Sequence, residues 1–595
     1  MMSVIDNSGI GSIKKQIFLG LGLLFSCFNL GAMCPQTVGS ISINEGIWNV
    51  LTRIGQATNV IESQICALGT PSSGGGSDFT CTFTFGQVDI GGGNIYTISV
   101  PGTYCMSENV TFSFGTAIRV ASSDVTIDLQ GHTLNGANEA LSVAGIRLEN
   151  FISNVTIQNG TIENISGSTF FAIRDSGVAA SIFDAALSNI VIKDINFNNN
   201  FSSIGLGVVP AEQVFLDGIL IENCNFFGTL APDIQLLSIS SIVRNCQLQN
   251  SFEILSPGVP AGTRYALVED CVVSSTSSVQ VGIISVAADN VVVRNCILQG
   301  PANQGINVAG TNVTISDCTL QDGDTSNPIY GLNLTNNGGA ALIERCFVAN
   351  NATGFYITNA GNSLKLVDCV AESNAFNGFY FNTPVSKITV QGCSAEANGI
   401  NGFVIQNNGT GQVISKITFE NCVAQGNSGD GFSLVNADPG SAISEVIFMN
   451  CVSQRNLGGT DGVTTWFGDG FGIGSASTNA GPIFDVLCQN CVAQRNVHDG
   501  LNFASTVTLG KILDNCSMFN TGTGFANLTG SSNAFVGNVS LFNVAADYSG
   551  LAVSDSIQSR AAGLGKIAAY ENGSHSMCEP FLLFLDFLTR PIMYS

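Results

Sequence analysis

Seven residues between positions 430 and 499 carry side chains that bind sugars or support acid–base chemistry. Arginine forms bidentate hydrogen bonds, and an aromatic ring offers a flat apolar face, so the two together are suited to a sugar ring. Carboxylates and an imidazole in the same stretch can accept hydrogen bonds from hydroxyl groups. These residues therefore predict a glycan-binding site made of Asp430, Arg455, Trp466, Asp469, Arg495, His498 and Asp499.

The aspartates in this set allow three interpretations. Asp469 and Asp499 are candidate catalytic carboxylates, because a glycosidase needs two carboxyl groups about 5–5.5 Å apart for retention or about 6.5–9.5 Å apart for inversion. Together with Asp430 they form a candidate calcium site, since Ca²⁺ prefers carboxylate oxygens. Each aspartate also precedes a glycine, and Asp-Gly is a favoured turn dipeptide that needs no ligand. In that third case the arginines only neutralise the aspartates, and no cofactor is required.

All seven residues belong to a repeat that runs through most of the chain. Self-similarity at a period of 20 to 50 residues indicates a solenoid. Cysteines mark the repeat at steps of 22 to 29 residues, with one step of 40 between Cys451 and Cys491. The series comprises Cys224, Cys246, Cys271, Cys296, Cys318, Cys346, Cys369, Cys393, Cys422, Cys451, Cys491 and Cys516.

Alternation within one repeat identifies the kind of solenoid. In "ITFENC" at 417–422 the apolar residues Ile417 and Phe419 are two positions apart, which indicates a strand. "CVAQ" forms a second strand and "GFSLV", opened by Gly431, a third, with polar corners between them. Parallel strands connect by right-handed crossovers. The sequence therefore predicts an all-β, right-handed parallel β-helix of about fifteen coils with three short strands each.

Stacked coils turn each repeated position into a column of side chains. We expect the cysteines to face inward and to remain thiols, because equivalent Cβ atoms on neighbouring strands lie farther apart than a disulfide allows. Cys488 falls on an apolar strand position and is predicted to be structural rather than a metal ligand. The asparagines that precede the cysteines can form a ladder through their amides. A second core column should contain Phe355, Phe379, Phe403, Phe432, Phe471 and Phe525.

The corner column that holds the aspartates changes its residue type along the chain. The residue before the glycine of the third strand is Asn377, Asn401, Asp430, Asp469, Asp499 and then Thr523 on successive coils. We therefore expect the three aspartates to stack along the axis of the solenoid.

Segments outside the repeat complete the predicted organisation. Residues 1–33 have the basic start and apolar run of a signal peptide, so the protein is predicted to be secreted or to lie at the cell envelope, with no membrane span in the mature chain. Residues 34–68 include an amphipathic helix that covers the open end, 69–79 form a Gly/Ser linker, 80–543 the β-helix, and 544–595 a cap or tail. Cys34, Cys66, Cys81 and Cys105 can form one or two disulfides whose pairing stays open.

The charge of the chain excludes one class of partner. The formal net charge is −23, with 20 Lys and Arg against 43 Asp and Glu, and no basic patch is present. Nucleic acid is therefore not an expected partner.

Three phrases near the start of the repeat resemble a known group of proteins. "YTISVPGTYCMSENVTF", "VTIDLQGHTLNG" and "GIRLENFISNVTIQNGTIEN" are similar to the opening coils of secreted right-handed parallel β-helix proteins of the pectin-lyase-like group, which carry carbohydrate-binding and sugar-hydrolase-type repeats. The resemblance covers roughly residues 80–543. It implies the fold, whereas the group includes lyases, hydrolases, epimerases and adhesins. His132, in "QGHTLNG", belongs to this signature and is predicted to be a turn residue.

The motifs that carry chemistry in the enzymes of this group do not occur here. Polygalacturonase-like hydrolases have Asn-Thr-Asp, Asp-Asp, Gly-His-Gly and Arg-Ile-Lys motifs, all absent from the chain. Alginate-epimerase-like members have Asp-Pro-His, to which only "NVHDG" at 496–500 comes near. The leading hypothesis is an exported, non-enzymatic β-helix that presents an elongated surface to glycans or a cell surface. The alternatives are a polysaccharide lyase or glycoside hydrolase acting at Asp469 and Asp499, and a structural rod of an envelope or surface layer.

Overall fold

A computed structural model shows a parallel β-helix of about 15 turns. It describes residues 80–549 and 560–561, apart from 91–93, 138–141, 167–170, 176–184, 208–214, 230, 239, 256–264, 275–283, 301–303, 324, 326–329, 337–338, 359–362, 383–384, 461–464, 467, 475–480, 505 and 528–532. The predicted signal peptide, amphipathic helix and linker lie outside the described residues, as do Cys34 and Cys66. No helix in the described part of the chain has the length and apolar character needed to cross a membrane.

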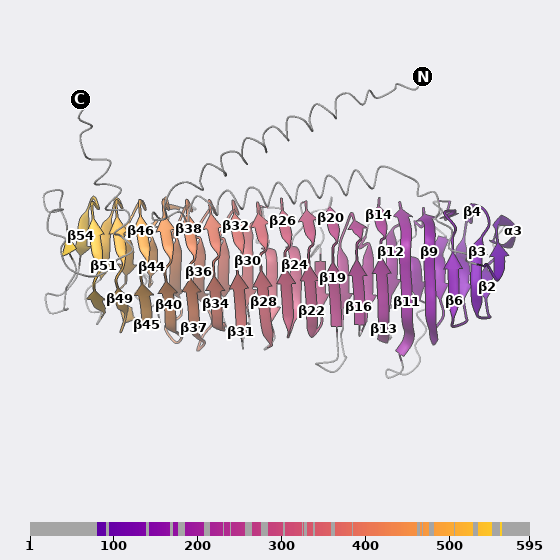
Figure 1. The fold of residues 1–595 in the computed structure, drawn as a ribbon, viewed down its shortest axis with the longest axis horizontal. Helices are drawn as coiled ribbons and strands as arrows, with labels where there is room; N and C mark the ends of the chain where they lie inside the picture. The colour runs from indigo at the N-terminus through magenta and orange to yellow at the C-terminus, as the bar shows by residue number, and fades with distance from the viewer. Residues whose placement is uncertain are drawn as a thin grey trace, which may run out of the picture. The chain divides into compact units, whose positions relative to one another are not determined.

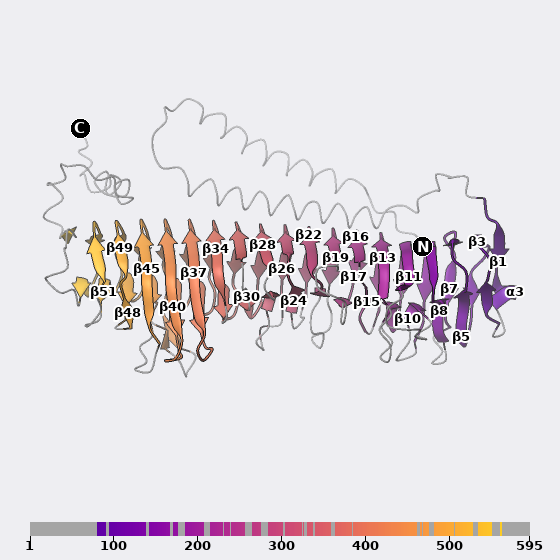
Figure 2. The same ribbon diagram turned by 90° about the horizontal axis from the view of Figure 1, so that it is seen from below.

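Most turns contain three strands, as the sequence predicts. In one coil these are β37 (Val413–Glu420), β38 (Val423–Gln425) and β39 (Phe432–Asn436). Each pairs in parallel with its counterparts in the neighbouring coils. Figures 1 and 2 show the coils stacked in chain order, from indigo to yellow. First and second strands make one sheet and third strands make another.

The first strands of the coils pair with one another in the sheet that also contains the second strands. They are β1 (Phe83–Phe85), β3 (Gly102–Met106), β6 (Val125–Asp128), β13 (Phe215–Glu222), β16 (Ser240–Arg244), β19 (Tyr265–Glu269), β22 (Asn290–Arg294), β25 (Val313–Ser316), β28 (Ala340–Glu344), β31 (Ser363–Val367), β34 (Ser386–Gln391), β37, β40 (Ala442–Met449), β45 (Ile483–Gln489), β48 (Val507–Thr508), β49 (Lys511–Leu513) and β52 (Ala534–Val536). In two coils the first and second strands merge into β9 (Ile152–Glu163) and β11 (Ala185–Asn198).

Second strands are short. They are β4 (Val110–Thr111), β7 (Thr133–Asn135), β14 (Asn225–Phe227), β17 (Gln247–Leu248), β20 (Val272–Ser274), β23 (Ile297–Gln299), β26 (Thr319–Gln321), β29 (Phe347–Ala349), β32 (Val370–Glu372), β35 (Ser394–Glu396), β38, β41 (Val452–Gln454), β46 (Val492–Gln494), β50 (Cys516–Met518), β53 (Val539–Leu541) and β55 (Arg560–Ala561).

The third strands of the coils form the other sheet. They are β2 (Tyr96–Ile98), β5 (Gly115–Val120), β8 (Ser142–Leu148), β10 (Phe171–Asp175), β12 (Ser202–Leu206), β15 (Ile234–Leu237), β18 (Phe252–Leu255), β21 (Ile284–Ala287), β24 (Gln304–Gly310), β27 (Tyr330–Asn336), β30 (Thr353–Thr358), β33 (Phe379–Asn382), β36 (Phe403–Asn407), β39, β44 (Phe471–Ile473), β47 (Leu501–Phe503), β51 (Thr523–Asn527) and β54 (Ala546–Ser549). Sheet pairing thus continues past residue 543, through β54 and β55.

Two further elements and one disulfide lie beside the regular coils. A short helix, α3 (Gln87–Ile90), lies between β1 and β2. A hairpin of β42 (Gly459–Thr460) and β43 (Thr465–Trp466) occupies the 40-residue step of the repeat. Cys81 is disulfide-bonded to Cys105, which resolves part of the pairing that the sequence left open.

Asparagine and aspartate recur at the corner before the cysteines because the backbone there adopts a left-handed conformation. Asn421 and Asn450 have φ of 55°, a left-handed conformation that asparagine tolerates better than most residues. The Asn450 amide donates a hydrogen bond to Asn421 Oδ1 at 3.3 Å. The predicted ladder of asparagines at this corner is confirmed for this pair.

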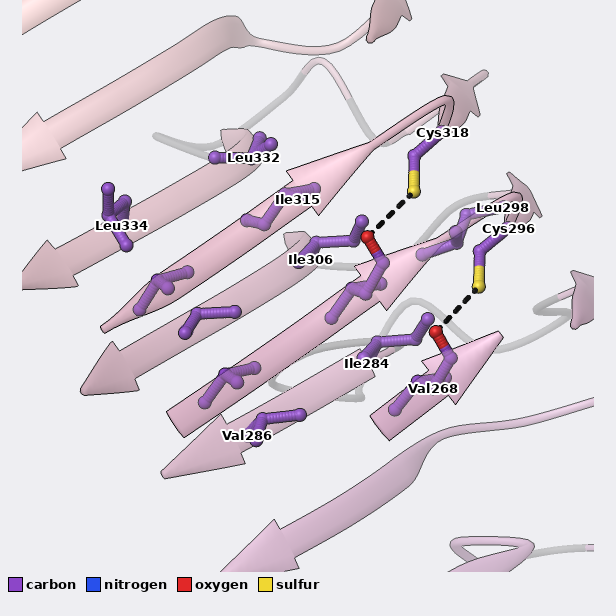
Figure 3. Packing of buried hydrophobic residues seen from close by; sticks show 14 of the residues in the cluster. Val268, Ile284, Val286, Cys296, Leu298, Ile306, Ile315, Cys318, Leu332 and Leu334 are labelled. Carbon is purple, nitrogen blue, oxygen red and sulfur yellow. Dashed lines mark hydrogen bonds between the residues drawn. The ribbon is translucent and has the colours of Figure 1, made fainter. Parts of the chain in front are cut away.

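The cysteine column lies in the core, and its thiols are hydrogen-bonded to backbone carbonyls. Cys296 donates to the Val268 carbonyl at 3.9 Å, and Cys318 donates to the Val293 carbonyl at 3.8 Å (Figure 3). Cys488 is also buried and pairs with Phe448 in the neighbouring strand, which confirms its predicted structural position. Buried free thiols were predicted for the whole series. They are found at Cys224, Cys246, Cys271, Cys296, Cys318, Cys346, Cys369, Cys393, Cys422, Cys451 and Cys491.

Cys516 is the exception, and its assignment to the column was wrong. Its partner in the neighbouring strand is Val492, so it lies one residue beyond the column, and it is disulfide-bonded. Asn515 takes the core position instead, where its Oδ1 accepts the Cys491 backbone N–H at 2.8 Å. The spacing of 25 residues between Cys491 and Cys516 does not reveal this register shift of one residue.

The predicted phenylalanine column is confirmed. Phe355, Phe379, Phe403, Phe432 and Phe471 are stacked with ring centroids 4.5 to 4.9 Å apart and interplanar angles of 4 to 7°. Leu501 follows Phe471 in the column, and Phe525 comes after it.

A buried asparagine column fills the corner between the second and third strands, and the sequence analysis did not identify it. Asn427 is 0% exposed and its amide donates to Asn456 Oδ1 at 3.0 Å. Asn398 donates in the same way to Asn427 at 2.9 Å. The column comprises Asn351, Asn374, Asn398, Asn427, Asn456, Asn496, Asn520 and Asn543. Its signal in the sequence is an asparagine five residues after each cysteine of the series from Cys346 to Cys491.

Candidate functional site

The three aspartates occupy equivalent positions in successive coils. The backbone N–H of Gly431 donates to the Asp469 carbonyl at 2.9 Å, and that of Gly470 donates to the Asp499 carbonyl at 2.8 Å. This is the register of a parallel ladder. The structure therefore places Asp430, Asp469 and Asp499 one above another, just before the third strand.

Each carboxylate in this column accepts a backbone N–H from the next coil. Asp430 Oδ1 accepts from Asp469 N at 3.0 Å, and Asp469 Oδ1 accepts from Asp499 N at 2.9 Å. Asn401 Oδ1 does the same for Asp430 N at 2.7 Å. One oxygen of each side chain thus satisfies a buried donor at the corner. This role accounts for the recurrence of asparagine and aspartate in the column without any ligand.

Asp469 also holds the imidazole of His498. Asp469 is 2% exposed, and its Oδ1 lies 2.6 Å from His498 Nδ1. Its Oδ2 accepts the Asn502 amide at 3.0 Å. The His498 side chain is 41% exposed and lies 3.5 Å from Asp499 Oδ2. The result is an imidazole on the surface, oriented by a buried carboxylate.

The environment of the cluster raises the pKa of three of its groups. The hydrogen bond to Asp469 raises the pKa of His498 to about 8, although burial opposes it. Burial raises the pKa of Asp430 to about 7, and the nearby charge of Asp469 adds to this. Burial also raises the pKa of Asp499. With a pKa of about 7, Asp430 holds its proton in part of the molecules at neutral pH, where an isolated carboxyl group would have released it.

The raised pKa of His498 predicts a pH-dependent contribution to stability. The hydrogen bond to Asp469 should stabilise the fold fully below about pH 6.5 and progressively less as the pH rises through about 8. We expect the Tm difference between the wild-type protein and His498→Asn to be largest near pH 6 and to shrink towards pH 9. Because the imidazole is 41% exposed, the effect should stay at about 1 kcal/mol or less. A difference that grows with pH would contradict this assignment.

Gly472 leaves room for the carboxylates. A Cβ atom at this position would come within 2.6 Å of Asp430 Oδ2 and 3.5 Å of Asp469 Oδ2. Gly472 lies between Ser433 and Asn502 in register, and the Ser433 hydroxyl donates to Asp430 Oδ2 at 3.2 Å. These three residues were not identified from the sequence. Their signal was their fixed position, three residues after each aspartate.

The arginines lie on the same corner but are not joined to the aspartates. Arg455 N donates to the Gln494 carbonyl at 3.1 Å, which places Arg455 next to Arg495 in the neighbouring coil. Both side chains are exposed. Within the described part of the chain, no ion pair links either of them to Asp430, Asp469 or Asp499. The idea that they only neutralise the aspartates therefore gains no support.

Trp466 is the one predicted site residue whose side chain lies outside the described residues. Its backbone forms β43, opposite Gly459. The predicted stacking role of its ring stays a prediction.

The donor atoms of the cluster fit calcium poorly. Among the described residues, Asp469, His498 and Asp499 each offer one ligand atom, and these atoms lie within 4.8 Å of one another. One of them is an imidazole nitrogen, whereas Ca²⁺ takes oxygen ligands. Asp469 already accepts three hydrogen bonds, from Asp499, His498 and Asn502. A cation would compete with these hydrogen bonds for the lone pairs of Asp469.

Comparison with known proteins agrees with the fold. The family described as a right-handed β-helix region matches residues 281–448, which include Asp430 but not Asp469, His498 or Asp499. No curated protein sequence matches the chain.

Solved structures with some similarity come from enzymes and from an adhesin. The A-module of the mannuronan C-5 epimerase AlgE6 from Azotobacter vinelandii has 11% identity over 74% of this chain and 91% of its own, with a TM-score of 0.24. The periplasmic alginate epimerase AlgG has 9% identity over 67% and 77%, with a TM-score of 0.22. PfbA, a surface adhesin of Streptococcus pneumoniae, has 13% identity over 78% and 86%, with a TM-score of 0.18. Likenesses at this level carry no argument about activity. What the repeat, the register and the family match establish together is that the chain is a right-handed parallel β-helix repeat protein.

Proposed function

We propose that this protein is exported and binds glycans at a cell surface, without catalysis, through the corner that contains Asp430, Arg455, Trp466, Asp469, Arg495, His498 and Asp499. The disulfide between Cys81 and Cys105 supports export, because disulfides persist in oxidising compartments. No cation is needed for this binding.

The observation that carries the proposal is that the side chains of Arg455 and Arg495 are exposed and, among the described residues, form no ion pair with a carboxylate. Five of the other described arginines are paired with carboxylates: Arg119 and Arg147 with Glu149, Arg244 with Glu222, Arg294 with Glu269, and Arg345 with Asp317. Arg174 donates instead to the backbone carbonyl of Asp175 at 3.0 Å. Arg455 and Arg495 are exposed, and among the described residues no such pair holds them. They extend from neighbouring coils, about 4.8 Å apart along the axis. Two adjacent guanidinium groups are suited to a glycan that carries carboxylates.

A glycan array followed by titration with the best anionic ligand tests this function. We expect the double variant Arg455→Ala/Arg495→Ala to lose at least tenfold in affinity. The double variant Arg244→Ala/Arg345→Ala removes the same charge from paired arginines and should bind within about twofold of the wild-type protein. Equal losses in the two variants, or no anionic ligand on the array, would overturn the proposal.

The enzymatic alternative has one observation in its favour. Burial raises the pKa of Asp499, as a general acid would require, although the nearby charge of His498 opposes this shift. Against it, Asp469 is 2% exposed and accepts three hydrogen bonds, which leaves it little freedom to reach a substrate. Release of reducing ends or unsaturated uronates that Asp499→Asn abolishes would favour the lyase or hydrolase. Neither binding nor product release would favour the structural rod.

A further inference from the structure

One stretch of the third-strand sheet carries no charged residue at all. Strands β24, β27, β30, β33 and β36 read QGINVAG, YGLNLTN, TGFYIT, FYFN and FVIQN. The whole chain has 63 charged residues, the sum of 20 Lys and Arg and 43 Asp and Glu, and several lie on the first and second strands of these same coils. The absence of charge is therefore a property of this face rather than of the region.

The outward positions of these strands form two neighbouring columns of uncharged side chains, most of them polar or aromatic. Leu332, Phe355 and Phe379 point into the core, so the residues beside them in each strand point outward. The first outward column is Asn307, Asn333, Tyr356, Tyr380 and Val404. The second is Ala309, Thr335, Thr358, Asn382 and Gln406. Most of these side chains are partly exposed.

Three tyrosine rings form a continuous stack on this face. The Tyr330 and Tyr356 ring centroids are 3.9 Å apart with an interplanar angle of 16°, and those of Tyr356 and Tyr380 are 5.4 Å apart at 26°. All three side chains are partly exposed, whereas Phe355 and Phe379 on the inner side of the same strands are 0% exposed. Packing of the core therefore does not explain the tyrosines.

Hydrogen bonds hold the edges of the stack. The Tyr380 hydroxyl donates to Gln406 Oε1 at 2.5 Å, and the Asn382 amide donates to the Tyr356 hydroxyl at 3.2 Å. Burial raises the pKa of Tyr330 and Tyr380 to about 12, so both phenols stay protonated and neutral. Rings and amides are thus held in fixed positions, which lowers the entropy lost when a ligand binds.

We propose that this tyrosine strip, formed by Tyr330, Tyr356, Tyr380, Asn382 and Gln406, binds a neutral oligosaccharide that lies along the axis of the solenoid. A sugar ring has an apolar C–H face that packs on an aromatic ring, and hydroxyls that pair with amides and phenols. The strip offers both and no charge, so an anionic ligand gains nothing from it. This site goes beyond the proposed function, because it uses none of the residues of the arginine corner and selects a different class of glycan.

Titration of the full chain with cellohexaose, xylohexaose and mannohexaose tests the strip. We expect at least one of these neutral sugars to bind, and Tyr356→Ala to lower its affinity at least tenfold. Tyr380→Phe keeps the ring and removes the hydroxyl with its hydrogen bonds to Gln406 and Asn408, and should cost about two- to fivefold. Arg455→Ala/Arg495→Ala should bind the neutral sugar as the wild-type protein does. Circular dichroism and Tm establish that each variant is folded.

Saturation-transfer NMR on the wild-type protein keeps the test decisive if Tyr356→Ala does not fold. Irradiation of the aromatic protons should saturate the C–H protons of the bound hexasaccharide. No binding of any of the three sugars, no transfer from aromatic protons, or unchanged affinity in folded Tyr356→Ala would each overturn the proposal. Binding of anionic glycans without neutral ones would reject the strip and keep the corner, and the reverse result would reject the corner alone.

Discussion

Replacing Asn427 by leucine should lower the free energy of unfolding of the coils around it by about 3–5 kcal/mol. Asn427 Oδ1 accepts both the backbone N–H and the amide of Asn398, at 3.0 and 2.9 Å. Its own amide donates to the Ala395 carbonyl at 3.2 Å. Leucine has a similar size but leaves these buried groups unpaired, at about 1–3 kcal/mol each. Hydrogen exchange resolved along the chain is the suitable measurement, because a solenoid can open locally.

Asn450→Gly is the matched control for Asn427→Leu. Asn450 belongs to the asparagine ladder before the cysteines and is partly exposed. It has φ of 55° and donates one side-chain hydrogen bond to Asn421, at 3.3 Å. Glycine keeps the left-handed conformation, so we expect a loss of about 0.5–1 kcal/mol or less. If both variants cost the same, the buried column would not be the source of the stability assigned to it.

Replacing Phe432 by alanine should cost about 3–5 kcal/mol in the same measurement. Phe432 is 0% exposed and stacks between Phe403 at 4.9 Å and Phe471 at 4.8 Å. It also makes edge contacts with Phe419 at 5.9 Å and Phe448 at 5.6 Å. Alanine leaves a cavity and removes these ring contacts together.

Leucine at the same position is the control for the cavity. Leu501 already occupies this column two coils further on, between Phe471 and Phe525, so the column accepts leucine. We expect Phe432→Leu to cost about 1–1.5 kcal/mol, mainly through the lost ring contacts. Protection lost to the same degree in both variants would show that the column depends on aromatic stacking rather than on volume.

The strands and core columns were predictable because parallel stacking converts a repeated position into a row of neighbours. Ile417 and Phe419 alternate with polar residues, and the cysteines return at nearly constant steps, so the fold and the inward-facing columns follow from the chain alone. Cys516 shows the limit of this argument. One extra residue before it moves the amide of Asn515 into the core, and a count of spacings does not detect such a shift.

The corners were less predictable, because turn formation and burial favour the same residue type there. Asn421 and Asn427 lie in one coil and are both asparagines at a corner, yet the first is exposed and the second is 0% exposed. Which one points inward depends on backbone dihedral angles, which the residue type alone leaves open.

The sequence by itself determined the solenoid, its three strands per coil and the stacking of Asp430, Asp469 and Asp499, since each depends only on periodicity. Only the tertiary structure decided that Asp469 holds His498 while Arg455 and Arg495 stay apart from the aspartates. It also placed Tyr330, Tyr356 and Tyr380 together on one face. The physical reason is that a side chain can adopt several rotamers at a given position. Which residue it contacts depends on the distances between atoms in neighbouring coils, and the order of residues along the chain does not give these distances.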